Sequence, residues 1–156
     1  MQTTHYPAFF FRQRQATDDA FIAKLAAQAF DEYSLRPVAT TLNMARSGVT
    51  WLALRDEQPV GFAVVRPSEA GQAELCAIAV DEHARGLGVG SALLAKVERV
   101  LALAGFSVLT IHTAQANLSA LELFLKRGFR VEQRLPRFYR GVFDACALRK
   151  RIAQAR

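Results

Sequence analysis

The chain has 156 residues, of which 51% are hydrophobic and 22% charged, with a formal net charge of +6. This is the size of one ordinary domain with one buried core, so we expect residues 1–156 to form a single domain. No apolar stretch approaches the roughly eighteen residues of a membrane span, and the start MQTTHYPAFFFRQ lacks the features of a secretory signal, so a cytoplasmic protein with no membrane partner is expected.

The first half of the sequence alternates short strand and helix patterns. Thr17 and Asp18 offer side chains that can cap a helix N-terminus, and apolar residues follow at helical spacing. Pro37 interrupts the next loop, and the turn Asp56–Pro59 between two apolar runs predicts a hairpin. The expected elements are a strand over Phe9–Arg14, a helix carrying Phe21, Ile22, Leu25 and Ala29, a helix over about residues 38–46, and strands over Thr50–Arg55 and Val60–Arg66.

The second half favours strand–helix–strand units. The run Ala73–Val80 is short, apolar and bounded by polar loops, as expected for a strand buried on both faces. Antiparallel hairpins followed by such units predict the α/β class, with a mixed, mostly antiparallel sheet flanked by helices. The elements expected after Val80 are a helix over residues 89–104 ended by Gly105, a strand over Phe106–Thr113, a helix from the cap Asn117 to Arg127 stopped by Gly128, and strands over Phe129–Gln133 and Phe143–Arg149.

The two cysteines and the basic residues point to no particular ligand. Cys76 and Cys146 lie in apolar stretches without the spacing of metal ligands, which indicates reduced core cysteines and no metal site. The positive charge favours anionic partners in general. Nucleic acid is not the favoured partner, because the basic residues are dispersed and no nucleic-acid-binding motif surrounds them.

A glycine-rich turn joins the apolar strand to the next helix, with Gly86, Gly88 and Gly90 in the segment RGLGVGS. Bare N–H groups at a helix N-terminus bind anions, and phosphate is the natural occupant. A P-loop is excluded because Gly-Lys-Ser/Thr is absent, and the dinucleotide fingerprint fails because Ser91 stands where its third glycine belongs. Two interpretations remain open from these residues alone: a phosphate site, or a tight turn with close helix packing.

The segment RGLGVG, from Arg85 to Gly90, resembles the Arg/Gln-x-x-Gly-x-Gly/Ala signature of the GNAT superfamily, the acyl-CoA-dependent N-acyltransferases. The segment NLSALELFLKRGF, which begins at Asn117, is similar to the superfamily's N-x-x-A…Y-x-x-x-G-F helix, and Ala73–Val80 resembles its fourth strand. The match extends from about residue 50 to the C-terminus. The resemblance implies a GNAT-like fold and an enzyme that transfers an acetyl group from acetyl-CoA to a primary amine.

By that resemblance, the pyrophosphate of coenzyme A lies against the amides of residues 86 to 91, and Arg85 is its charge partner. The backbone of Ile78–Val80 would pair with the pantetheine arm, where one amide would stabilise the thioester oxyanion. Asn117 would face the pantetheine and Phe124 the sulfur, although a helix cap and a core aromatic explain these two as well. The expected cofactor-binding residues are Ile78, Ala79, Val80, Arg85, Gly86, Leu87, Gly88, Val89, Gly90, Ser91, Asn117 and Phe124.

Acetyl transfer needs a neutral amine, and a lysine-like amine with a pKa near ~10.4 is neutral in only about one molecule in a few thousand at pH 7. Glu74, eleven residues before Arg85, stands where several family members carry a catalytic glutamate. His112, five residues before Asn117, stands where the ribosomal-protein N-terminal acetyltransferases place a glutamate. Both are candidate general bases. The alternative for Glu74 is an exposed carboxylate at a strand end, and the alternative for His112 is a histidine packed between sheet and helix.

Phe124 departs from the family pattern, because many members carry there a tyrosine that protonates the leaving thiolate. Phenylalanine cannot donate a proton, although a thiolate with a pKa near ~8.5 leaves without a dedicated acid. Tyr139, in the segment RFYR, is a candidate replacement and resembles an aromatic stretch that contacts substrate in N-terminal acetyltransferases; a rim aromatic is the alternative. Phe124 also keeps open a non-catalytic acyl-CoA-binding module.

The expected acceptor is a small-molecule amine that attacks directly in a ternary complex, with a protein N-terminus as the alternative. Asp31, Glu32 and Tyr33 suit a cationic amine, whereas the arginines between the last two strands suit a carboxylate or phosphate. These arginines are Arg134, Arg137 and Arg140.

Exposed strands near the C-terminus would support a homodimer.

Overall fold

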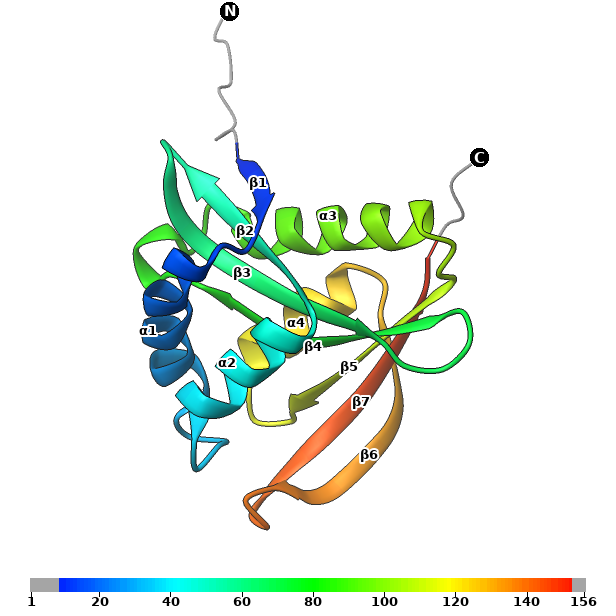
Figure 1. Ribbon diagram of the computed structural model, residues 1–156. Helices are drawn as coiled ribbons and strands as arrows, with labels where there is room; N and C mark the ends of the chain where they lie inside the picture. Colours follow the sequence, from blue (N-terminus) through cyan, green and yellow to red (C-terminus); the bar gives the residue numbers. More distant parts are fainter. Residues whose placement is uncertain (1–8, 153–156) are drawn as a thin grey trace, which may run out of the picture.

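The computed structural model describes residues 9–152 (Figure 1). Most of the N-terminal segment, for which no secretory signal is expected, lies outside the described part. No helix within residues 9–152 is long and apolar enough to cross a membrane. The strands are β1 (Phe10–Gln13), β2 (Val49–Arg55), β3 (Gln58–Pro67), β4 (Gln72–Val80), β5 (Val108–Ala114), β6 (Arg130–Tyr139) and β7 (Phe143–Arg151). The helices are α1 (Asp19–Phe30), α2 (Pro37–Ser47), α3 (Val89–Leu103) and α4 (Leu118–Lys126), with short 3-10 turns at Ala16–Asp18 and Glu82–Ala84.

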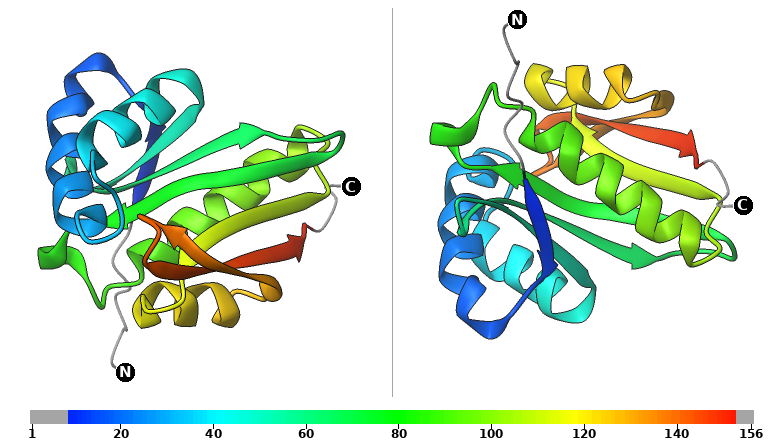
Figure 2. Two further views of the ribbon diagram at one scale, coloured as in Figure 1. Left: turned by 90° about the horizontal axis from the view of Figure 1, so that it is seen from below. Right: turned by 90° about the horizontal axis from the view of Figure 1, so that it is seen from above.

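The seven strands form one sheet in the order β1-β2-β3-β4-β5-β7-β6. Only β4 and β5 pair in parallel; the other neighbouring strands of the described chain are antiparallel. Helices α1 and α2 cover one face of the sheet, and α3 and α4 cover the other (Figure 2). The predicted mixed, mostly antiparallel sheet flanked by helices is therefore confirmed.

Strand β4 lies in the middle of the sheet and packs into the core on both faces, and a bulge changes which residues face which side. Leu75 pairs with Val65 and Ala77 with Val64, so Cys76 is an extra residue in β4. A bulge re-aims the side chains that follow it. Leu75 accordingly packs with the residues under α3, whereas Ala77 belongs to the cluster under α1 and α2.

Two expectations for the N-terminal half are wrong in detail. Pro37 does not lie in a loop but begins α2, where its fixed φ suits the first turn and its missing N–H costs no bond. Asp18 does not cap α1 with its side chain, because its buried carboxylate accepts two N–H groups of Arg12 at 2.7 and 2.9 Å. The Arg12 guanidinium lowers the pKa of the Asp18 carboxyl. Asp18 therefore fastens β1 to the start of α1.

Strand β6 is longer than expected, since it runs to Tyr139 instead of ending at Gln133. Its pairing with β7 is irregular between Leu135 and Tyr139 and then resumes with Tyr139 opposite Phe143. The carboxylate of Asp144 accepts the Arg137 N–H at 3.0 Å within this irregular stretch. β6 also forms one edge of the sheet, opposite the edge strand β1, and is exposed along most of its length.

Candidate active site

The parallel strands β4 and β5 separate near the middle of the sheet. They pair from Gln72 opposite Val108 to Leu75 opposite Ile111, and then diverge (Figure 1). β4 continues to Val80 and stays paired with β3 on its other side. The backbone of Cys76–Val80 therefore has no partner in β5 on the side of the gap. Backbone N–H and C=O groups require partners when buried, so this edge can accept an extended ligand.

The glycine-rich turn after β4 serves two purposes. Gly86 and Gly88 have φ angles of 78° and 83°, and a Cβ atom at either would meet nothing within 4 Å. Gly90 differs, because a Cβ there would lie 3.0 Å from Cδ2 of Leu123 in α4. The first two glycines thus expose bare backbone at the N-terminus of α3, while Gly90 allows close helix packing. Close helix packing thus accounts for Gly90, and the phosphate site stays a prediction for the open backbone at Gly86 and Gly88.

The other residues of the turn differ in how their side chains are used. Arg85 is exposed, as expected of a partner for a phosphate. Val89 is 1% exposed and packs in the core, so only its backbone remains for a ligand. Leu87 packs against the same core cluster, and Ser91 is half-buried.

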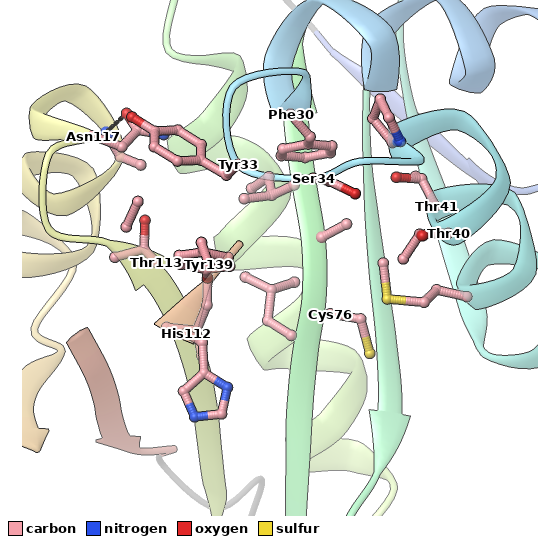
Figure 3. Close-up of a pocket in the computed structure, with 18 of the residues that line it drawn as sticks. Phe30, Tyr33, Ser34, Thr40, Thr41, Cys76, His112, Thr113, Asn117 and Tyr139 are labelled. Carbon is pink, nitrogen blue, oxygen red and sulfur yellow. Dashed lines mark hydrogen bonds between the residues drawn. The ribbon is translucent and has the colours of Figure 1, made fainter. Parts of the chain in front are cut away.

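A cavity of about 360 Å³ lies beside the gap between β4 and β5 (Figure 3). Its walls come from the loop between α1 and α2, from α2, β4 and β5, from the start of α4 and from the end of β6. This volume is in the range of small-molecule sites. Six of the expected site residues line it: Glu74, Ile78, His112, Asn117, Phe124 and Tyr139.

Glu74 lines the cavity and is bound by Arg66, its partner across the β3–β4 pair. Its Oε2 atom accepts Nε–H of Arg66 at 3.2 Å and Nη2–H at 3.1 Å. This bond raises the pKa of Arg66. Arg66 was missed in the sequence, although counting outward from the turn after β3 would have placed it near Glu74.

His112 is exposed at the cavity and contacts an aromatic residue of β6, since its ring centroid lies 5.2 Å from that of Phe138. In Figure 3 the His112 ring points away from Asn117. The histidine is therefore not enclosed between sheet and helix, and it is accessible to a substrate or to water.

Tyr139 lies opposite Tyr33, with 5.8 Å between ring centroids, and both line the cavity. Burial raises the pKa of Tyr139 to about 12. Full proton transfer to a thiolate with a pKa near ~8.5 would be uphill by about 5 kcal/mol. Tyr139 is therefore suited to donate a hydrogen bond and poorly suited to replace the missing acid.

Asn117 and Phe124 have the structural roles that the sequence allowed, and both also line the cavity. The Asn117 Oδ1 atom accepts the Ala120 N–H at 3.3 Å, which caps α4, and the residue also lines the cavity (Figure 3). Phe124 is 1% exposed and meets Phe129 edge-on at 5.6 Å, yet it too lines the cavity.

The two cysteines are free, as expected, but they are not equally buried: Cys146 is buried, whereas Cys76 is half-buried at the bulge and lines the cavity. Burial and the nearby Glu74 raise the pKa of the Cys76 thiol to about 11. Thiolate, the nucleophilic form, is therefore scarce at neutral pH.

Comparison with known families identifies the class of protein. A model of the acetyltransferase (GNAT) family matches residues 14–129, and the chain therefore belongs to this family. Membership indicates acetyl-CoA-dependent acetyltransferase activity. The split strands, the open glycine turn and the adjoining cavity fit that activity.

The chain is similar to several acetyltransferases. An uncharacterized N-acetyltransferase of Methanocaldococcus jannaschii is 26% identical over 107 residues, which is 68% of each chain. Ard1 from Thermoplasma volcanium superimposes with a TM-score of 0.83 at 22% identity, covering 94% of this chain and 99% of Ard1. The ribosomal-protein-S18-alanine N-acetyltransferase from Escherichia coli superimposes with a TM-score of 0.77 at 19% identity, covering 96% of this chain and 97% of that enzyme. The two structural matches concern the fold.

Proposed function

We propose that the protein transfers the acetyl group of acetyl-CoA to a small-molecule primary amine, which attacks directly in a ternary complex. The observation that carries the proposal is the separation of β4 from β5 after Leu75, beside a cavity that Cys76, Ala77 and Ile78 line. The predicted contacts Ala79 and Val80 do not line this cavity. An extended pantetheine arm can pair with the open edge of β4 as an added strand does. Acetyl-CoA supplies the activated acyl group, and the chain supplies binding, orientation and a base.

The glycine turn supports a phosphate group at the start of α3. The amides of residues 86 to 91 would hold the pyrophosphate, and Arg85 would contribute its charge. The open space above Gly86 and Gly88 supports close approach of a ligand to the backbone. Val89 and Gly90 would contribute through their backbone alone, because Val89 is in the core and Leu123 fills the space beside Gly90.

Direct attack is favoured over an acetyl-cysteine intermediate. The only cysteine at the cavity, within the described residues, is Cys76, and its raised pKa of about 11 keeps it a thiol. Glu74 is the proposed base for the incoming ammonium, with His112 as the alternative. Because Cys76 and Cys146 are both free, a reducing cytoplasmic location is part of the proposal.

A protein N-terminus is the second candidate acceptor. Tyr139 lies at the cavity, as the resemblance to N-terminal acetyltransferases implies. One structural relative is, by its name, an acetyltransferase for the alanine of ribosomal protein S18. An α-amine with a pKa of about 7.7–8.0 is partly neutral at pH 7, so such a substrate depends less on a base.

The test of the proposed function is release of CoA from acetyl-CoA in the presence of primary amines and N-terminal peptides. We expect acetylated amine and free CoA to form in equal amounts with at least one acceptor. Tight binding of acetyl-CoA without turnover on any acceptor would instead identify the non-catalytic binding module.

We expect Gly88→Ala to weaken CoA binding about tenfold or more, because its methyl group would enter the space proposed for the pyrophosphate. Gly105→Ala is a matched control: Gly105 has a φ of 92° and equally open surroundings, but it lies beyond the other end of α3. Both variants carry similar backbone strain, of about 1–2 kcal/mol. Isothermal titration with CoA should separate them; equal CoA affinities would contradict the proposed pyrophosphate site.

A further inference from the structure

One wall of the cavity is mostly apolar and aromatic, with Ser34, Thr40 and Thr41 as its polar residues. This wall comes from the end of α1, the α1–α2 loop, α2 and the end of β6. Aromatic walls bind apolar groups and flat rings, since such surfaces gain most when water is removed from them. The residues in question are Phe30, Tyr33, Pro37, Met44, Phe138 and Tyr139.

The cavity offers one carboxylate and no basic side chain among its described lining residues other than His112. That carboxylate belongs to Glu74, and Arg66 already binds its Oε2 atom. Asp31 and Glu32, which the sequence suggested for a cationic amine, do not line the cavity. The walls can therefore balance one ammonium group, and a second buried ammonium would lack a partner.

The three arginines that the sequence suggested for an acidic group do not line the cavity: Arg134 and Arg137 lie in β6, and Arg140 follows it. Arg134 pairs with Asp144 at the surface, and Arg140 donates to the backbone carbonyl of Glu32 at 3.2 Å. Arg137 is exposed and does not line the cavity. A carboxylate or phosphate on the acceptor consequently has no site within the cavity walls.

The α1–α2 loop and the β6–β7 hairpin are in contact at the cavity. Tyr33 and Tyr139 both line it (Figure 3). The Tyr33 ring lies 5.8 Å from that of Tyr139 and 5.2 Å from that of Phe143. The Arg140 bond to Glu32 fastens the same two segments. At these distances the rings contact one another, so Tyr33 and Tyr139 form one continuous aromatic wall of the cavity. A flat apolar group can pack against such a wall.

We propose that the acceptor is a primary amine that carries one positive charge on an apolar, ring-sized body, and that Tyr33 and Tyr139 hold this body. The inference rests on the proposed function and names the chemistry of its acceptor. A free arylalkylamine and the N-terminal residue of a polypeptide both carry this chemistry. Polyamines, aminoglycosides and amines bearing a carboxylate or phosphate do not.

Two matched pairs of free amines test the two halves of the proposal. 2-Phenylethylamine and ethylamine differ in the ring, and we expect kcat/KM to be about 30- to 100-fold higher with the ring. Hexylamine and 1,6-diaminohexane differ in the second ammonium, and we expect the monoamine to be at least about tenfold better. A third pair, tetrapeptides that begin with Phe or Asp, shows whether the acceptor is a free amine or a polypeptide N-terminus. Turnover of the Phe peptide without turnover of the free amines or of the Asp peptide identifies a polypeptide acceptor.

Tyr33→Ala tests the contribution of the aromatic wall directly. We expect the KM for 2-phenylethylamine to rise about tenfold, while kcat/KM for ethylamine changes less than about twofold. Leu103→Ala is the control, because Leu103 is 69% exposed on α3 and does not line the cavity. CoA affinity, measured in parallel, should be the same in both variants.

The results distinguish failure of this inference from failure of the proposed function. If kcat/KM for 1,6-diaminohexane equals that for hexylamine, or kcat/KM for ethylamine equals that for 2-phenylethylamine, the proposed acceptor chemistry is wrong. The proposed acetyl transfer would still hold, because these amines are acetylated. An equal loss for ethylamine and 2-phenylethylamine in Tyr33→Ala would also overturn the proposed acceptor chemistry. If no acceptor, free or peptide, releases CoA, the proposed function itself fails.

Discussion

Glu74→Gln is expected to lower kcat with an alkylamine at pH 7 by about 10²-fold or more, because it removes the proposed base. Glutamine has almost the shape of glutamate and still offers an oxygen to Arg66, so the β3–β4 pair should stay intact. An amide cannot take up the proton of an ammonium group, and with an amine pKa near ~10.4 few molecules are neutral without help. Steady-state rates of CoA release at saturating acetyl-CoA measure the effect.

The pH dependence of Glu74→Gln should separate loss of a base from loss of structure. Below the pKa of an alkylamine, each pH unit raises its neutral fraction about tenfold, so the variant should regain about 10²-fold between pH 7 and pH 9. With a peptide α-amine of pKa about 7.7–8.0, both the initial loss and the recovery should be smaller. The profile thus also reports which source of acceptor the enzyme uses.

Glu69→Gln is the matched control for this experiment. Glu69 is exposed in the turn between β3 and β4, outside the cavity lining, and its replacement should leave kcat within about twofold. If Glu74→Gln behaves like this control, the carboxylate is not the base. His112→Gln then becomes the decisive variant, because the His112 ring is exposed at the same cavity.

The features that the sequence predicted well depend on neighbouring residues along the chain. The Asn117 cap requires only that its side chain reach the Ala120 N–H, three residues on. Gly105 and Gly128 both adopt a φ of 92° just after a helix, which glycine allows at no steric cost. The glycine turn after β4 is local in the same sense, and for that reason a short motif was enough to locate it.

The features that the sequence missed depend on contacts between distant segments. The bulge at Cys76 is visible only in the register between β3 and β4. Because of this bulge, Leu75 and Ala77 face opposite sides of the sheet, although they are two residues apart. Tyr33 and Tyr139 meet only because β6 continues past Pro136 through an irregular stretch, in which Asp144 binds the Arg137 N–H. Hydrophobic periodicity reports neither strand register nor loop conformation, so it could not reveal that these two tyrosines meet.

Glu98→Ala is expected to lower the free energy of unfolding by about 2–3 kcal/mol, since it leaves two partly buried cations without their shared partner. Glu98 on α3 is 9% exposed; its carboxylate pairs with Lys150 of β7 and accepts Nη2–H of Arg127, which follows α4, at 3.0 Å. The melting temperature should fall by about 5–10 °C.

Glu122→Ala provides the comparison for Glu98→Ala, because Glu122 makes one exposed pair with Lys126 within α4. Its loss should cost at most about 0.5 kcal/mol. Urea titration of both variants gives the difference, and equal midpoints would show that the buried cluster contributes no more than a surface pair. The cluster joins α3, which starts at the open glycine turn, to the end of α4, which starts at Asn117 beside the cavity. A large effect of Glu98→Ala would therefore mean that one carboxylate holds α3 and α4 together. These are the two helices that border the proposed cofactor site.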